Sequence, residues 1–462
     1  MYKLRPYQQE TIELCGTSIS KGIKGVLCVL PTGAGKTVIF ASMANKASEN
    51  GYTVLIITDS KKLFKQTSNY FDNPTIINAE ANVNLDIQVG SIIVSMAQTL
   101  SRRSKTMDKL NNIPNLLVIV DEAHVKTSCK PLYKLDNSIN IGFTATPCGD
   151  HLKDLFFELH DVITIPELIH EHYLTPCKSW SRRIVDTSNL KKAKGEYTEQ
   201  SQTEAFRTGH YGLLDDLRTV NYKKALVFTS CIAQCDQVAE YLKSNGIDVA
   251  VVHSEQDDIE LFYQEHAVCV SVGMLTKGFD YPIIDLVIIF RKTTSTPLFL
   301  QMCGRGGRKA EGKEVWNIID YGGNIEVHGL WDSVREWEIG GEKKKVKGDD
   351  GEDIITAIPL CECNGCGYVS LDKFEVCPEC GSDVKKQEIV DVETEKKLWS
   401  SDKDPNKLTA QELFRYACEM KSRRLAIRIA RRRGQDYLTE YAKAAGYSPH
   451  WVGVVMNNYG YY

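Results

Sequence analysis

The segment LPTGAGKT at residues 30–37 constrains the fold more than any other stretch of this chain. It lies between the apolar runs VLCV and VIF, an order that predicts a buried strand, a tight turn and a helix. Glycine at positions 33 and 35 lets the backbone reach conformations that a Cβ atom would block. The N–H groups at the start of the helix then form a site for phosphate. The predicted nucleotide contacts in this turn are Thr32, Gly33, Ala34, Gly35, Lys36 and Thr37.

Two residues give this turn its chemistry. Lys36 can place a positive charge against the β and γ phosphates, and Thr37 can ligate magnesium. The strict phosphate-loop pattern requires glycine at the position that Leu30 occupies, so this turn departs from the pattern at one residue. A glycine-rich turn before a helix is often only a tight connection, but Lys-Thr at this spacing favours phosphate binding.

A second signal for phosphate chemistry is LVIVDEAH at 117–124. The apolar run predicts a buried strand, and ligands of open α/β sheets collect at the carboxyl ends of the strands. We expect Asp121 to hold Mg²⁺ and Glu122 to polarise water. A lone acidic pair is usually solvated surface, but after a phosphate loop it forms a coherent site for ATP hydrolysis.

Apolar runs alternate with helical stretches over most of the chain, which predicts an α/β fold with parallel sheets. The first series is VLCVL, VLIIT, SIIVS, LLVIV and IGFTAT; the second comprises residues 224–230, 248–254, 267–273, 285–290 and 315–320. We therefore expect two sheet domains in tandem. The predicted division is a first domain at 1–165, a linker or small insertion at 166–215, a second domain at 216–339, a zinc ribbon at 340–395 and a basic helical region at 396–462.

Composition narrows the class of protein. The 462 residues are too many for one ordinary core, and the N-terminus has no apolar segment of the kind that directs secretion. We expect a soluble, cytoplasmic protein that does not bind membranes. The net charge of −4 argues weakly against a polyanionic partner unless basic residues gather locally. Fifteen cysteines suit reduced thiols plus one metal site better than a disulfide framework.

Five of the cysteines fall within CECNGCGYVSLDKFEVCPEC at 361–380. Two C-x-x-C pairs ten residues apart are typical of a zinc ribbon, in which four thiolates close a tetrahedral structural site. A redox role is the alternative, but two C-x-x-C turns that occur together rarely serve thiol exchange. The predicted Zn²⁺ ligands are Cys363, Cys366, Cys377 and Cys380, and Cys361 is left as a spare thiol.

Basic residues gather near the C-terminus. Residues 401–462 carry eleven Lys and Arg against six Asp and Glu, and no acid occurs between 421 and 433. Residues 412–433 also show helical periodicity, so this segment suits contact with phosphates, with a solvated basic face as the alternative. Trp451 and Tyr447 could stack on bases, although we expect such aromatic residues to be core.

The order of these motifs resembles that of the superfamily-two helicases and translocases, through residues 4–308. LRPYQQE resembles the adenine-reading motif, LPTGAGKT motif I, DEAH motif II and GFTATP at 142–147 motif III. SKKLFKQT and SMAQTL are similar to motifs Ia and Ib. ALVFTS resembles motif IV, TKGFDYPIIDLVI at 276–288 motif V, and QMCGRGGR at 301–308 motif VI.

The resemblance implies two RecA-like domains and further site residues. Arg5 and Gln8 would contact adenine, Gly278 and Asp280 would lie at the nucleotide, and Thr144 and Thr146 would couple it to nucleic acid. Gln301 would lie near the γ-phosphate, and Arg305 and Arg308 would reach across the cleft between domains as arginine fingers. ATP would then drive movement along a strand whose backbone, rather than base sequence, is recognised.

The motor followed by a cysteine ribbon and a basic tail also resembles RadD-like repair ATPases and phage branch-migration helicases. That resemblance implies a DEAH-box DNA helicase acting on forks and four-way junctions in replication, recombination or repair, with proteins of those processes as possible partners. The alternatives are an RNA helicase, a restriction-type motor subunit, and an ATP-gated clamp that binds DNA without moving.

Overall fold

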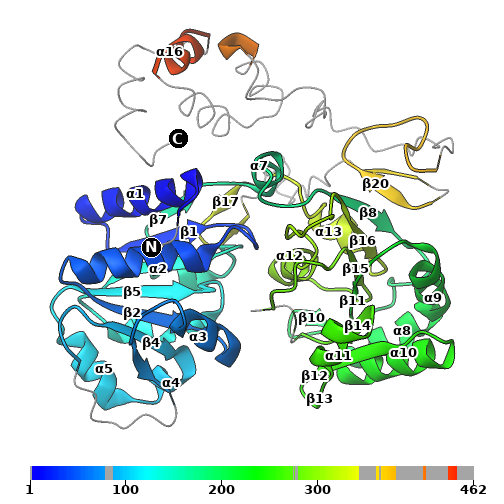
Figure 1. Ribbon diagram of the computed structural model, residues 1–462, viewed down its shortest axis with the longest axis horizontal. Coiled ribbons are helices and arrows are strands. Elements are labelled where there is room, and N and C mark those ends of the chain that lie inside the picture. The colour runs from blue at the N-terminus through cyan, green and yellow to red at the C-terminus, as the bar shows by residue number, and fades with distance from the viewer. Residues whose placement is uncertain are drawn as a thin grey trace, which may run out of the picture.

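The chain folds into two α/β bodies, each built on a parallel sheet (Figure 1). The computed structural model describes residues 3–78, 87–273, 275, 279–342, 360–363, 366–380, 409–412 and 435–444. The first body is blue to cyan in Figure 1 and the second is green. This architecture confirms the two parallel α/β sheets that the alternating apolar runs predict, and the two RecA-like domains that the resemblance implies.

Seven parallel strands form the first sheet, in the order β3-β4-β2-β5-β6-β1-β7. Their bounds are β1 Gly25–Val29, β2 Thr53–Thr58, β3 Thr75–Ile77, β4 Ile92–Met96, β5 Leu116–Asp121, β6 Ile139–Thr144 and β7 Glu158–Asp161. Every residue of β1, β2 and β5 is buried, as expected for strands that helices cover on both faces. The two short outer strands, β3 and β7, are absent from the predicted series.

The helices of the first body begin with α1, whose first residue is a proline and at whose N-terminus the Arg5 N–H donates to the Gln8 side-chain oxygen at 3.0 Å. They are α1 Pro6–Ser20, α2 Lys36–Glu49, α3 Lys61–Ser68, α4 Ala97–Ser101, α5 Ser104–Asn111, α6 Lys126–Cys129 and α7 Ile165–His170, with short 3-10 turns at Lys130–Lys134 and Asp150–Leu152.

The second sheet has nine strands, in the order β13-β12-β14-β11-β15-β16-β8-β20-β19. Their bounds are β8 Cys177–Ser181, β11 Ala225–Phe228, β12 Val249–His253, β13 Gln256–Asp257, β14 Val268–Ser271, β15 Leu286–Ile289, β16 Trp316–Asp320, β19 Cys361–Glu362 and β20 Tyr368–Ser370. The six central strands from β12 to β8 are parallel, and β13, β20 and β19 pair antiparallel at the ends.

Helices and one small hairpin lie around this sheet, and a second small hairpin lies beside the first body (Figure 1). The helices are α8 Glu199–Phe206, α9 His210–Thr219, α10 Ile232–Ser244, α11 Ile259–Gln264, α12 Thr296–Cys303 and α13 Asn324–His328, with a 3-10 turn at Arg207–Gly209. The hairpins pair β9 Lys192–Ala193 with β10 Glu196–Tyr197, and β17 Trp337–Glu338 with β18 Gly341–Glu342. A last described helix, α16, spans Gln435–Ala444.

The segment 166–215 differs from the linker that the sequence suggests. β8 pairs with β16 inside the second sheet, and Phe206 and Leu213 are buried in the core beneath it. The chain therefore enters the second body at β8, well before the first apolar run of the second series. The ribbon is likewise attached to this body, since β20 pairs with β8.

No helix among the described residues is long and apolar enough to cross a membrane. The predicted basic helix from residue 413 onward, and with it Tyr447 and Trp451, lies outside the described residues.

Candidate active site

The predicted phosphate turn lies between β1 and α2, at the carboxyl edge of the first sheet. Gly33 and Gly35 adopt left-handed φ angles of 90° and 78°, which other residues rarely adopt. Gly35 immediately precedes α2, so Lys36 and Thr37 occupy its first turn. The Lys36 ammonium donates to the Leu30 carbonyl at 3.3 Å, so its charge lies over the turn. The turn thus has the backbone geometry of a phosphate site.

The N-terminal motif is attached directly to this turn. The carbonyl of Ala34 accepts from the Tyr7 hydroxyl at 2.7 Å and from the Gln8 amide at 3.0 Å. Arg5 donates to the Tyr7 hydroxyl at 3.1 Å and stacks over the ring of Tyr173 at 4.3 Å. Arg5 and Gln8 are thus brought to the phosphate turn. Tyr7 was not among the predicted site residues, although it lies inside LRPYQQE.

The acidic pair stands at the end of β5. Burial and, to a smaller extent, the charge of Glu122 raise the pKa of Asp121 to about 7. The charge of nearby Lys36 acts in the opposite direction but does not outweigh them. Glu122 has a φ of 52°, an uncommon conformation for a residue with a side chain and a form of backbone strain that clusters at functional sites. A buried carboxylate of this kind favours a nearby cation, so the donor set of Asp121 and the Thr37 hydroxyl fits Mg²⁺.

His124 joins three motifs and was missed as a site residue. Its Nδ1 lies 3.0 Å from the Thr144 hydroxyl and 3.4 Å from the Glu122 carboxylate, while its Nε2 lies 3.2 Å from the amide nitrogen of Gln301. An amide nitrogen only donates, so Nε2 must accept and the proton must be on Nδ1. His124 therefore connects the first body to α12 of the second.

The Thr144 hydroxyl continues this chain of hydrogen bonds. It donates to the Thr146 carbonyl at 2.8 Å and accepts from the Thr146 N–H at 3.0 Å. Both threonines are fully buried. The turn after β6 is therefore fixed against the imidazole of His124.

Arg305 and Arg308 are bound within the second body. Both guanidinium groups donate to the carbonyl of Phe279, and Arg308 pairs with the Asp280 carboxylate at 2.7 Å. Burial, then the charge of Arg308, lowers the pKa of Arg305 to about 9. Two neighbouring buried cations favour an anion between them, which fits a phosphate group. The Arg308 side chain also lies against the phosphate turn, since a Cβ atom on Gly33 would lie 3.9 Å from its Cγ. Gly278 lies outside the described residues.

The two bodies meet at the phosphate turn itself. A Cβ atom on Gly304 would lie 3.0 Å from the Cβ of Thr32, and one on Gly33 would lie 2.8 Å from Leu174. Leu174 in turn forms an antiparallel bridge with Arg308. Gly304 precedes Arg305, so the arginine-bearing turn of the second body packs on the phosphate turn of the first.

Lys313 is a second buried residue that no sequence motif marks. Its buried ammonium donates to the carbonyls of four residues in motifs V and VI: Pro282, Ile284, Gly306 and Arg308. Burial lowers its pKa to about 8. No local pattern marks it, because its partners come together only in the folded sheet.

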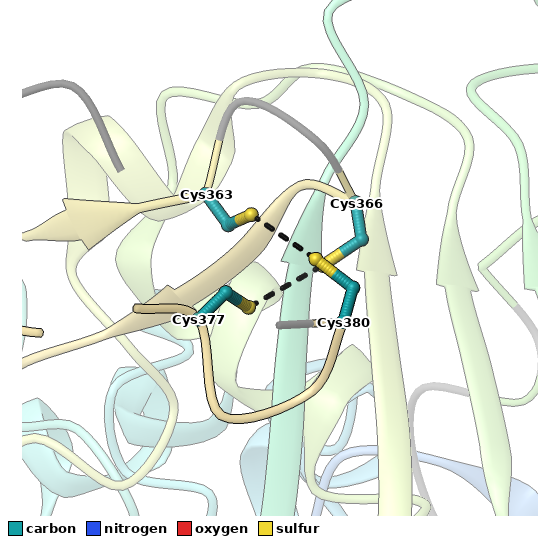
Figure 2. A group of neighbouring side chains, drawn as sticks. All are labelled: Cys363, Cys366, Cys377 and Cys380. Carbon is teal, nitrogen blue, oxygen red and sulfur yellow. Dashed lines mark hydrogen bonds between the residues drawn. The ribbon is translucent and has the colours of Figure 1, made fainter. Parts of the chain in front are cut away.

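The four predicted zinc ligands converge at one point (Figure 2). Cys363 and Cys380 have sulfur atoms 3.6 Å apart, and those of Cys366 and Cys377 are 3.7 Å apart. Zn–S bonds of about 2.3 Å in a tetrahedron separate the sulfurs by about 3.8 Å, so the residues fit zinc. Cys361 instead points its thiol toward the Phe374 carbonyl and is not part of the cluster.

The ribbon is fixed to the second body by backbone and charge contacts. Gly367 has a φ of 76°, and a Cβ atom there would lie 2.3 Å from the Ser181 carbonyl. Arg182 donates to the Cys366 carbonyl at 2.7 Å, and Lys178 pairs with Glu379 at 2.8 Å. The cysteine site thus has a defined position on the β8 edge of the sheet.

Comparison with known families agrees with this division into two bodies. Residues 1–148 match the family described as "Type III restriction enzyme, res subunit", and residues 209–310 match "Helicase conserved C-terminal domain". Together these matches indicate a superfamily-two helicase.

The chain is 26% identical over 403 residues to a 51.5 kDa protein of a Lactococcus phage (isolate 7-9), covering 83% of this chain and 84% of that protein. It is 29% identical to the putative ATP-dependent helicase IRC3 of Saccharomyces cerevisiae, covering 70% of this chain but only 52% of the yeast protein. A fragment of a putative HsdR subunit of a type I restriction enzyme from Vibrio vulnificus YJ016 has a similar fold, with a TM-score of 0.56 at 23% identity, covering 71% of this chain and 67% of the fragment.

Proposed function

We propose that this chain, an ATP-hydrolysing helicase of superfamily two by its matched domains, translocates on DNA and remodels branched DNA such as forks and four-way junctions. Its nucleotide would be ATP with Mg²⁺, bound by the phosphate turn together with Asp121 and Thr37. When bound, the metal would neutralise phosphate charge. Glu122 would orient the attacking water, and Arg305 and Arg308 would leave the Phe279 carbonyl to stabilise the transferring phosphate.

The observation that carries this proposal is the hydrogen bond between His124 and Gln301. It connects a residue of the DEAH motif to a residue 177 positions away, on the other body. A change at the Glu122 carboxylate therefore alters a contact that holds the two bodies together. Opening and closing of two such bodies is the motion by which a motor moves along a strand.

Preference for DNA is supported by the regions after the motor. The ribbon has a fixed position on β8, and the basic segment follows it in the chain. We propose that the ribbon directs this segment, with residues 396–462 contacting DNA phosphates. The preference for branched DNA rests on the resemblance of this layout to that of branch-migration helicases.

The test is ATP hydrolysis by the full chain with no nucleic acid, single-stranded DNA, duplex DNA, a four-way DNA junction or structured RNA, at matched nucleotide concentration. Strongest stimulation by the junction supports branch migration, and strand displacement on that junction is then measured. Strongest stimulation by RNA would leave the motor in place and refute the DNA assignment.

A second candidate is a motor subunit of a restriction-type complex, favoured by the match of residues 1–148 to a restriction subunit family. This candidate predicts that strand displacement requires a partner subunit. Displacement of a junction strand by the purified chain alone would exclude that requirement.

A further inference from the structure

The segment Leu330–Glu342, which we call the strap, runs from the second body back to the first. It follows α13 and ends in the small hairpin of β17 and β18 (Figure 1). Within it, the Gly340 N–H donates to the Pro147 carbonyl at 3.0 Å, and the Gly149 N–H donates to the Gly340 carbonyl at 3.1 Å. These partners come directly after Thr144 and Thr146, so the strap is fixed to the turn that contacts His124.

At its other end the strap contacts the arginine loop, residues Arg305–Arg308. A Cβ atom on Gly307 would lie 2.5 Å from Cη2 and 2.6 Å from Cζ2 of Trp331. A Cβ atom on Gly306 would lie 2.0 Å from the indole of Trp316. Neither glycine has a left-handed φ, so glycine is required at both positions only because a Cβ atom would collide with an indole ring. The arginine loop therefore lies directly on two indole rings.

The two indoles form a rigid support. They pack edge to face with centroids 5.0 Å apart at 78°, and both are at most 1% exposed. Trp316 also donates to the Thr175 carbonyl at 3.0 Å, and the Thr175 N–H donates to the Gly307 carbonyl at 2.8 Å. The position of the loop thus follows the position of Trp331.

Arg335 holds the strap in the shape that presents Trp331. Its guanidinium, on a residue only 6% exposed, donates to four strap or neighbouring carbonyls: those of His328, Leu330, Trp331 and Ser333. No carboxylate forms an ion pair with it among the described residues. A planar cation with five donors can bind four carbonyls at once, whereas lysine cannot reproduce that geometry.

A small cavity of about 40 Å³ separates this part of the strap from the phosphate turn. Trp331, Ser333 and Arg335 of the strap line it together with Pro31 and Thr32 of the phosphate turn. The strap therefore shares a cavity with the phosphate turn and contacts both the arginine loop and the turn after β6.

We propose that Trp331 and Arg335 are positioning residues for ATP hydrolysis, which place the arginine loop and couple its movement to the Thr144–Thr146 turn. This inference rests on the proposed ATPase function. The alternative is that Trp331 is ordinary core packing, whose loss lowers stability and leaves the turnover of folded protein unchanged.

The experiment is a double-mutant cycle in the full chain. Trp331→Phe removes the ring atoms nearest Gly307, and Gly307→Ala adds the Cβ atom that meets them. Each single variant should lower kcat about 10- to 100-fold with the Kd for ATP within twofold, because misplacing a catalytic group by about 1 Å costs about 100-fold. The double variant should recover at least about tenfold over Gly307→Ala, because the added methyl group then has room.

Arg335→Lys should lower kcat in the same way as Trp331→Phe, while Trp180→Phe, a matched indole loss on β8, should leave kcat unchanged. Thermal unfolding of each variant gives the folded fraction that normalises kcat. An unchanged normalised kcat in Trp331→Phe, or effects that simply add in the double variant, would overturn the proposal. A wild-type chain that hydrolyses no ATP would instead refute the proposed function itself.

Discussion

Replacing Gln301 by methionine should slow ATP hydrolysis and leave ATP binding intact. Methionine keeps the volume of the side chain but removes the amide that donates to His124 at 3.2 Å. Gln301 is 4% exposed, so water cannot readily replace the lost donor. A buried polar atom left without its partner costs about 1–3 kcal/mol, which corresponds to about 5- to 150-fold in kcat if that cost falls on the transition state and not on the ATP-bound ground state.

The assay is steady-state hydrolysis combined with a double-mutant cycle. His124→Phe should reduce kcat by a similar factor, since it leaves the Gln301 amide without an acceptor. The double variant should be little worse than His124→Phe alone, because neither side of the hydrogen bond between residues 124 and 301 then remains unpaired. Binding of a fluorescent ATP analogue reports Kd separately and should change by less than twofold.

Gln202→Met is the matched control. Gln202 is also a buried glutamine, and it accepts from the Lys292 N–H at 2.8 Å, away from the acidic pair. Its loss should lower thermal stability and leave kcat unchanged. The reasoning fails if the effects of Gln301→Met and His124→Phe add within about 0.5 kcal/mol, the behaviour of independent sites, or if the control slows hydrolysis equally.

Three further predictions concern the proposed catalytic residues, the ribbon and acid stability. Lys36→Ala and Glu122→Gln should each abolish hydrolysis while DNA binding, measured by fluorescence anisotropy, is retained; full turnover in Lys36→Ala would show that the phosphate site is elsewhere. Metal analysis should find one zinc per chain, lost in Cys377→Ala together with part of the thermal stability, because metal binding contributes to folding; a metal-free wild type of equal stability would refute the ribbon. Burial and, to a smaller extent, the charge of Arg207 lower the pKa of His210 from its usual 6.5. Folding therefore favours the neutral imidazole, and the folded state loses stability as pH falls below about 6.5. Its Nε2 is buried without a hydrogen-bond partner among the described residues, so His210→Phe should be more stable by about 1 kcal/mol and less sensitive to acid, as measured by thermal unfolding at pH 5 and pH 8; unchanged acid sensitivity would argue against this role.

The sequence predicted the central strands of both sheets because they are short, continuous apolar runs bounded by polar turns, such as LVIVD before Glu122. It missed β7 and β8, since ELHD and CKSWS carry no such run. β8 is a strand because β16 and β20 lie on either side of it to supply hydrogen bonds. That condition is set by tertiary structure, which outweighs local propensity.

Site residues could be identified where chemistry follows from local spacing. Lys36 after Gly35 and the Asp121–Glu122 pair are of this kind, and so are the two C-x-x-C pairs. The roles of His124, Lys313 and Arg335 depend on partners that only folding brings close. Lys313 and Arg335 bind backbone carbonyls, which every residue possesses, so no sequence pattern can reveal them.

Several contacts between the two bodies involve the same few residues. Gly304 packs on Thr32 of the phosphate turn, Gln301 bonds to His124, and the strap joins the arginine loop to the turn after β6. Because a phosphate group at the turn would draw Arg305 and Arg308 away from the Phe279 carbonyl, it would act on the very loop through which the bodies touch. On the proposed function, nucleotide binding would therefore be coupled to relative movement of the two bodies, which is the property that a translocating motor requires.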